Sequence, residues 1–142
     1  MLLDTNALAM VLTDDPRLPR KARQRIGDAD RAALSVISLC EISQNVRLGP
    51  WPDLVPFAPA QLDRADADGF DLLPLSPSTA LAAALLDWDH RDPFDRMIAG
   101  VSRQEELLLI SADAAFRFPR AREALGLSWS PFRSCQEWVR AA

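Results

Sequence analysis

Long apolar runs are missing from this 142-residue sequence. No stretch approaches the ~20 consecutive apolar residues that a membrane-spanning helix needs, so we do not expect an integral membrane protein. The amino terminus reads Met1-Leu2-Leu3-Asp4 and lacks the basic flank and apolar core of a secretion signal. We therefore predict that the protein is cytoplasmic and has no membrane partner.

Cysteine and histidine are scarce as well. Only two cysteines are present, and Cys40 lies among apolar residues, so we expect it to be a small buried side chain in a protein from a reducing compartment. His90 is the only histidine, which excludes a catalytic histidine pair. A lone histidine is more often a surface or packing residue than a base.

Basic residues are fewer than acidic ones, and lysine is almost absent. Lys21 is the only lysine among sixteen basic residues, and twenty acidic residues bring the net charge to −4. Bulk charge therefore does not favour non-specific binding of polyanions. One short segment gathers several bases, a pattern that is more often a solvated helix face than a binding site. Its members are Arg17, Arg20, Lys21, Arg23 and Arg25.

The remaining composition is that of an ordinary globular protein. Hydrophobic residues make up 49% and charged residues 25% of the chain, which excludes disordered and fibrous classes. The length fits one compact domain. We predict a single domain over residues 1–142, in which residues 130–142 form a C-terminal extension or an interface segment.

Short apolar runs alternate with longer segments of helical periodicity, which predicts an α/β fold. Such an alternation indicates a parallel sheet covered by helices on both faces. The predicted strands are Leu2–Leu3, Ala32–Val36, Phe70–Leu75 and Leu107–Ile110. The predicted helices are Ala7–Leu12, Arg20–Ile26, Leu39–Leu48, Ala60–Asp68, Thr79–Leu86 and Asp95–Glu105.

Several helix starts carry capping signals. Ser76 and Asp92 each precede a proline, the pattern of an N-cap followed by proline in the first turn. Ser38 and Glu41 have the spacing of a capping box. The proline-rich residues 50–59 are predicted to be a stiff connector, and the tail after Leu127 to contain a last strand and a terminal helix.

Four acidic residues follow predicted strands or lie about one turn into helices: Asp4, Glu41, Asp95 and Asp113. Because ligands of open parallel sheets bind beyond the carboxyl ends of the strands, the four side chains could converge there. Clustered carboxylates repel one another, and Mg²⁺ or Mn²⁺ would remove that conflict. Each residue also has a simpler interpretation. Glu41 could close the capping box, Asp95 could favour a helix N-terminus, and Asp4 and Asp113 could be caps or turn residues.

Four strings together resemble the PIN-domain ribonucleases, and in particular the VapC-type toxins of bacterial toxin–antitoxin pairs. The strings are Leu2-Leu3-Asp4-Thr5-Asn6, Ser38-Leu39-Cys40-Glu41-Ile42, His90-Arg91-Asp92-Pro93-Phe94-Asp95-Arg96-Met97-Ile98-Ala99 and Ile110-Ser111-Ala112-Asp113. The resemblance extends from residue 1 to about Trp129, and the His90–Arg96 string is its most specific part.

The resemblance implies a three-layer α/β/α fold and an endoribonuclease that depends on Mg²⁺ or Mn²⁺. It assigns metal binding and catalysis to Asp4, Glu41, Asp95 and Asp113. Supporting polar roles fall to Thr5, Asn6, Asp92 and Ser111, with Asp92 acting first as a helix cap. Asn45 stands where many relatives carry lysine, which leaves Arg47 as a substitute for any basic contact there.

The resemblance also implies partners. They are an RNA substrate, a second copy of the chain in a homodimer, and a cognate antitoxin whose C-terminal segment covers the acidic groove. The predicted reaction is hydrolysis of an RNA phosphodiester by metal-activated water, leaving a 5′-phosphate and a 3′-hydroxyl.

Two other functions stay open at this point. The first is a non-catalytic binding module that has kept the fold, although such a module has no electrostatic reason to retain four clustered acids. The second is a phosphohydrolase that uses Asp4 as a covalent nucleophile. That class needs a second acid two residues further on, where this chain has Asn6.

Overall fold

A parallel β-sheet forms the centre of the protein in the computed structural model, which describes residues 1–113, 116 and 132–134. In the described part the sheet has five strands in the order β3-β2-β1-β4-β5, and every neighbouring pair is parallel. The strands are β1 (Leu2–Leu3), β2 (Ala33–Ser35), β3 (Asp71–Leu73), β4 (Leu109–Ser111) and β5 (Phe132–Ser134).

Helices connect the strands and cover both faces of the sheet. The α-helices are α1 (Thr5–Leu12), α2 (Arg20–Gly27), α3 (Val36–Leu48), α4 (Gln61–Ala67), α5 (Pro77–Ala84) and α6 (Pro93–Gln104). Two short 3₁₀ helices, η1 (Pro52–Leu54) and η2 (Ala58–Ala60), occupy the proline-rich connector. None of the helices described here is long and apolar enough to cross a membrane.

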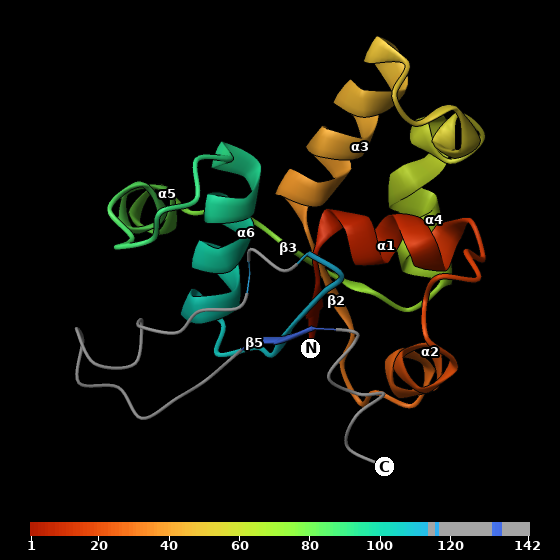
Figure 1. Ribbon diagram of the computed structural model, residues 1–142, viewed down its shortest axis with the longest axis horizontal. Coiled ribbons are helices and arrows are strands. Elements are labelled where there is room, and N and C mark those ends of the chain that lie inside the picture. Colours follow the sequence, from red (N-terminus) through yellow and green to blue (C-terminus); the bar gives the residue numbers. More distant parts are fainter. Residues whose placement is uncertain (114–115, 117–131, 135–142) are drawn as a thin grey trace.

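Alternating side chains of the strands divide the core into two halves. Leu2, Ala33 and Leu109 pack with Ile98 and other residues of one buried cluster, on the side of α5 and α6. The following residues of the same strands, among them Leu3 and Leu34, pack into a second cluster with α1, α2, α3 and α4. Figure 1 shows these two groups of helices on opposite sides of the sheet. The predicted three-layer α/β/α fold is confirmed.

Helices α5 and α6, which cover one face of the sheet, pack closely against each other. A Cβ atom added to Gly100 of α6 would lie 2.9 Å from the Cβ atom of Ala83 in α5, so no larger residue fits there without movement. The predicted caps of both helices are present. Ser76 Oγ accepts from Thr79 N at 3.1 Å, and Asp92 Oδ1 accepts from Phe94 N at 2.8 Å.

The structure corrects the prediction for the start of α3. The helix begins at Val36, directly after β2, and its cap is Ser35, whose Oγ accepts from Ile37 N at 3.2 Å. Ser38 lies inside the helix, fully buried, with no hydrogen-bond partner for its hydroxyl among the described residues. A capping box between Ser38 and Glu41 is therefore wrong, because the chain turns from strand to helix three residues earlier.

Two further predictions about single segments have clear outcomes. Cys40 is exposed rather than buried, because it lies on the outer side of α3 while Ile42 faces the core. The last strand predicted in the tail is present as β5. The predicted terminal helix, like most of residues 130–142, lies outside the described residues.

Candidate functional site

The carboxyl ends of β1 and β4 lie side by side at the middle of the sheet. From β1 the chain builds β2 and β3 on one side, and it later builds β4 and β5 on the other. A change of direction of this kind leaves a crevice beyond the carboxyl ends of the two central strands, where ligands of open α/β sheets bind. Asp4 directly follows β1, and Ser111 ends β4.

Asp4 is a buried carboxyl group at the start of α1. Only 1% of the residue is exposed, and its Oδ1 caps the helix by accepting from Ala7 N at 2.6 Å. Ser111 Oγ donates to the other carboxyl oxygen. The pKa of Asp4 is raised to about 7, mainly by burial; the charges of Asp95 and Glu41 act in the same direction, and the two hydrogen bonds oppose them. Asp4 thus titrates near neutral pH.

Glu41 reaches the same region from α3. Its half-buried side chain accepts a hydrogen bond from Thr5 Oγ1 at 2.5 Å. Burial raises the pKa of Glu41, and the charges of Asp95 and Asp92 act in the same direction, while the bond from Thr5 opposes them. The contact with Thr5 takes the place of the capping interaction that the sequence suggested as an alternative.

Asp95 lies in the first turn of α6. Its Oδ2 is 2.5 Å from Nε2 of His90, the only histidine. Burial raises the pKa of Asp95, and the charges of Asp92 and Asp113 add to this effect, whereas His90 lowers the pKa. The histidine therefore contacts a site residue and is not a simple surface residue, although its sequence position alone does not indicate this.

The structure places the remaining predicted residues at different depths. Asp113 is half-buried, and its backbone N donates to Ser111 Oγ at 2.9 Å, so one serine hydroxyl links Asp113 to Asp4. Thr5 is buried beside Asp4. Asp92 is an exposed helix cap, and Asn6 is exposed on α1.

Asp4, Glu41 and Asp113 each interact electrostatically with Asp95, but the four acidic residues do not form a preformed metal site. Among the described residues, no three histidine, cysteine or acidic side chains are grouped closely enough to hold a metal ion as they stand. Oxygen atoms of Asp4, Glu41 and Asp95 are instead bound by Ser111, Thr5 and His90. The ligand types suit a hard cation such as Mg²⁺, which would compete with these three groups for carboxylate oxygens.

An aromatic cluster that contacts Asp95 through His90 was not predicted from the sequence. The rings of His90 and Trp88 stack at 4.6 Å between centroids, and Phe116 lies 5.3 Å from Trp88. Arg96, the residue after Asp95, donates hydrogen bonds to five backbone carbonyls of residues 83–90. No local pattern predicts such bonds, because their acceptors are backbone atoms.

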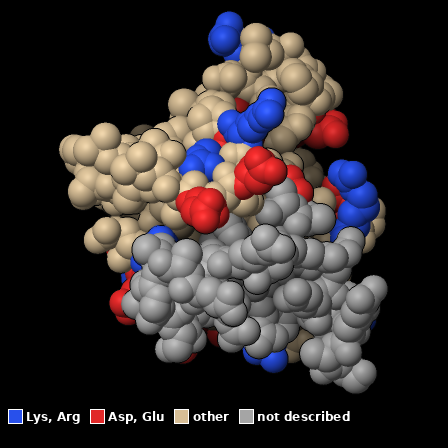
Figure 2. Space-filling view, turned by 60° about the vertical axis from the view of Figure 1, so that its left-hand side comes forward, with Lys and Arg blue, Asp and Glu red and all other residues tan. Residues whose placement is uncertain are grey.

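The predicted basic segment lies apart from the acidic residues. Figure 1 shows α2 well away from the place where α1, α3 and α6 begin. Arg17 forms an ion pair with Asp15, and Arg23 with Asp14, so part of the segment stabilises the turn between α1 and α2. On the face shown in Figure 2, acidic and basic side chains are intermixed, and the described part of that face is not uniformly basic.

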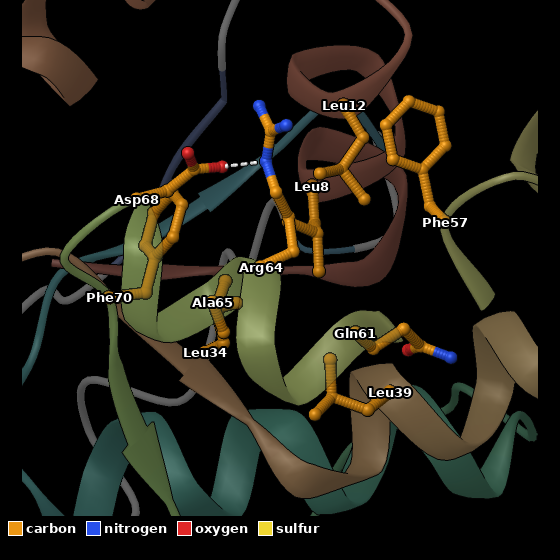
Figure 3. A pocket seen from close by; sticks show the side chains of 10 residues that line it. All are labelled: Leu8, Leu12, Leu34, Leu39, Phe57, Gln61, Arg64, Ala65, Asp68 and Phe70. Atoms are coloured by element: carbon orange, nitrogen blue, oxygen red, sulfur yellow. Dashed lines mark hydrogen bonds and ion pairs between the residues drawn. The ribbon is translucent and has the colours of Figure 1, made fainter. Parts of the chain in front are cut away.

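A separate apolar pocket lies on the face of the sheet that is covered by α1, α3 and α4. Its walls come from α1, β2, α3, α4 and the proline-rich connector, which contributes Phe57. An ion pair between Arg64 and Asp68 borders it (Figure 3). None of the four acidic site residues lines this pocket. The pocket is therefore distinct from the acidic site.

Comparisons with known proteins agree with this fold. The sequence model of the PIN domain family matches residues 1–122. A solved structure described as a toxin–antitoxin complex from Klebsiella pneumoniae superposes with a TM-score of 0.58, at 19% identity, over 84% of this chain and 92% of that chain. At this identity the likeness shows a shared fold. No curated protein sequence matches.

Proposed function

Because the chain belongs to the PIN domain family, whose members are generally nucleases, we propose that it is a metal-dependent endoribonuclease and the toxin of a toxin–antitoxin pair. The observation that supports this proposal is the electrostatic coupling of four carboxyl groups: the charge of Asp95 raises the pKa values of Asp4 and Glu41, and the charge of Asp113 raises that of Asp95. Burial and mutual repulsion raise the pKa values of Asp4, Glu41 and Asp95. A divalent cation would relieve the repulsion that this arrangement creates.

The proposal gives each site residue a task. Asp4, Glu41, Asp95 and Asp113 would hold Mg²⁺ or Mn²⁺, which when bound lowers the pKa of a water molecule and offsets the charge of the scissile phosphate. Ser111 and Thr5 orient carboxylate oxygens of Asp4 and Glu41. Asp92 fixes the start of α6 and so the position of Asp95. Asn6, exposed beside the site, is available to contact substrate.

The Asp4 carboxyl group would make cation binding at the site depend on pH. With a pKa of about 7, its carboxyl group is partly protonated in the metal-free protein at neutral pH. Because metal ligands must be deprotonated, cation binding at Asp4 would release a proton and strengthen with rising pH. We therefore expect activity to need more cation at pH 6 than at pH 8.

The proposed partners follow from the family and from the similar solved structure, which is a toxin–antitoxin complex. They are single-stranded RNA, an antitoxin that places an arginine among the carboxylates, and a second copy of the chain. An arginine fork is suited to this place because it matches carboxylate geometry and stands in for the cation's charge. The proposed location is the cytoplasm.

Cleavage of single-stranded RNA tests the proposal. We expect wild-type protein to cut RNA with Mg²⁺ or Mn²⁺ and to lose this activity in excess chelator. Asp4→Asn keeps the side-chain size and the cap of α1 but removes the charge, so we expect a loss of at least about 100-fold. Asp66→Asn makes the same change at an exposed position of α4 and serves as the matched control.

Three results would contradict the proposal: cleavage that survives chelation, full activity of Asp4→Asn, or no cleavage of any RNA by the wild type. The last result would favour a non-catalytic binding module. A phosphohydrolase with Asp4 as nucleophile would instead release phosphate from small phosphate esters and leave RNA intact.

A further inference from the structure

Arg96 occupies an unfavourable place for a cation. It lies in the first turn of α6, where the helix dipole presents its positive end. Its side chain does not extend into solvent, however. The guanidinium group turns back toward the carboxyl end of α5 and the loop after it, where backbone carbonyls are directed at it.

Every nitrogen of the guanidinium group donates to the end of α5 or to the loop after it. Nε donates to the carbonyl of Ala83 at 3.2 Å. Nη2 donates to those of Ala84 and Leu86 at 3.1 and 2.6 Å. Nη1 donates to those of Trp88 and His90 at 3.0 Å or less. Arginine has five N–H donors, and here five carbonyls accept from them. Lysine, with three donors, cannot make the same set of bonds.

The loop held in this way carries His90, which is fixed at three points. Its carbonyl accepts from Arg96 Nη1 at 3.0 Å, its ring stacks on Trp88, and its Nε2 lies 2.5 Å from Asp95 Oδ2. Two successive residues of α6 therefore hold the same histidine, Asp95 by the ring and Arg96 by the backbone. One Asp95 oxygen is thus linked through His90 to the loop that Arg96 binds.

We propose that Arg96 is a positioning residue for the acidic site: by ordering the carbonyls of residues 83–90 it places the His90 ring so that one Asp95 oxygen is fixed. Partners that orient a metal-ligating carboxylate typically change metal affinity or activity about 10- to 100-fold when they are removed. This inference rests on the proposed function for its effect on cleavage, but not for its effect on His90.

Nuclear magnetic resonance of the imidazole group tests the structural half of the inference without any activity. Because His90 is the only histidine, its ring nitrogen signals need no assignment among several. We expect Arg96→Lys to shift and broaden these signals, toward the spectrum of Asp95→Asn. Arg103→Lys, the same change at an exposed position in the last turn of α6, is the matched control and should leave them unchanged. Unchanged His90 signals in folded Arg96→Lys would overturn the inference.

Kinetics test the functional half. We expect Arg96→Lys and His90→Gln each to lower kcat about tenfold and to raise the half-saturating Mn²⁺ concentration, with KM for RNA within about twofold of the wild type. The double variant should be no worse than the worse single variant, because both act through Asp95. His90→Gln leaves the carbonyl of residue 90 in place, so the test stands even where Arg96→Lys folds poorly.

The resonance and kinetic experiments together distinguish failure of the inference about Arg96 from failure of the proposed function. Additive losses in the double variant, or a change in KM alone, would overturn the positioning role of Arg96. A wild-type protein that cleaves no RNA would contradict the proposed function, while the resonance experiment would still decide whether Arg96 positions His90.

Discussion

Helices α1 and α6 both begin on an aspartate, and the two starts have very different surroundings. Asp4 caps α1 by accepting from Ala7 N at 2.6 Å and is 1% exposed, whereas Asp92 caps α6 by accepting from Phe94 N at 2.8 Å and lies at the surface. Ser111 donates to Asp4 from the end of a neighbouring strand. Asp92 accepts from backbone N–H groups of its own helix. An aspartate N-cap is thus an exposed group in one place and a buried titratable group in the other.

Of the changes at the two caps and their partners, replacing Asp4 by Asn should have the largest effect, and this effect should be on how the free energy of unfolding varies with pH. The Asp4 carboxyl has a pKa of about 7 in the folded protein and 3.8 as its ordinary value, so between these pH values the folded state holds a proton that the unfolded state has released. The free energy of unfolding of the metal-free protein therefore falls as pH rises from about 4 to 7, by ~4 kcal/mol from this group. Asp4→Asn should lack that part of the fall.

Urea unfolding in chelator, repeated from about pH 4 to pH 8, measures the difference. Asp92→Asn is the matched control, because it makes the same change at the exposed cap and should keep the part of the pH-dependent fall in unfolding free energy that comes from Asp4. Equal slopes for wild type and Asp4→Asn would show that the two aspartates do not differ as the structure indicates.

Ser111→Ala should have the second-largest effect, on both the stability of the protein and its dependence on pH. The serine hydroxyl donates to Asp4 and accepts from Asp113 N, so its removal should cost about 2 kcal/mol of stability. Since the bond from Ser111 favours the ionised carboxylate, its loss should also move the midpoint of the pH-dependent fall to higher pH.

Ser102→Ala separates these two effects. Ser102 is a buried serine of α6 that donates to the carbonyl of Leu107. We expect Ser102→Ala to reduce stability by a similar amount without moving the midpoint. A midpoint that stays in place or falls in Ser111→Ala would contradict the assigned bond.

Asp92→Ala should have the smallest effect of the three. Loss of an exposed N-cap typically costs about 1 kcal/mol, and asparagine serves almost as well as aspartate. We expect Asp92→Asn to be within a few tenths of a kcal/mol of the wild type and Asp92→Ala to unfold about 1 kcal/mol more easily at neutral pH. Equal destabilisation by Ala and Asn would indicate that the charge, rather than the cap, is what matters there.

Features encoded within a few neighbouring residues were predictable from the sequence. The apolar runs located four of the strands, helical spacing located the six α-helices, and the proline that follows Ser76 or Asp92 marked two caps. The α/β class and the sheet covered on both faces follow from this alternation. The ends of strands and helices also indicated the four acidic residues.

Features that depend on distant parts of the chain were not predictable in this way. Strand order, the buried state of Asp4 and the bond from Thr5 to Glu41 all require the packed structure. Ser38 has the spacing of a cap, but Ser35 forms the actual one because β2 leads into α3 without a loop. The contact of His90 with Asp95 was missed because Arg96 binds the loop of His90 through backbone carbonyls, which carry no sequence signal.

The bond between Ser111 and Asp4 joins residues 107 positions apart, and this separation sets a time order during translation. A ribosome adding roughly 5–20 residues per second needs several seconds to pass from one to the other. Throughout that interval the nascent chain carries Asp4 without its serine partner, and β1 without its neighbour β4. A chain released by a ribosome that stalls before residue 109 would lack both Ser111 and Asp113, so under the proposed function only a chain extended past residue 113 would carry all four acidic residues.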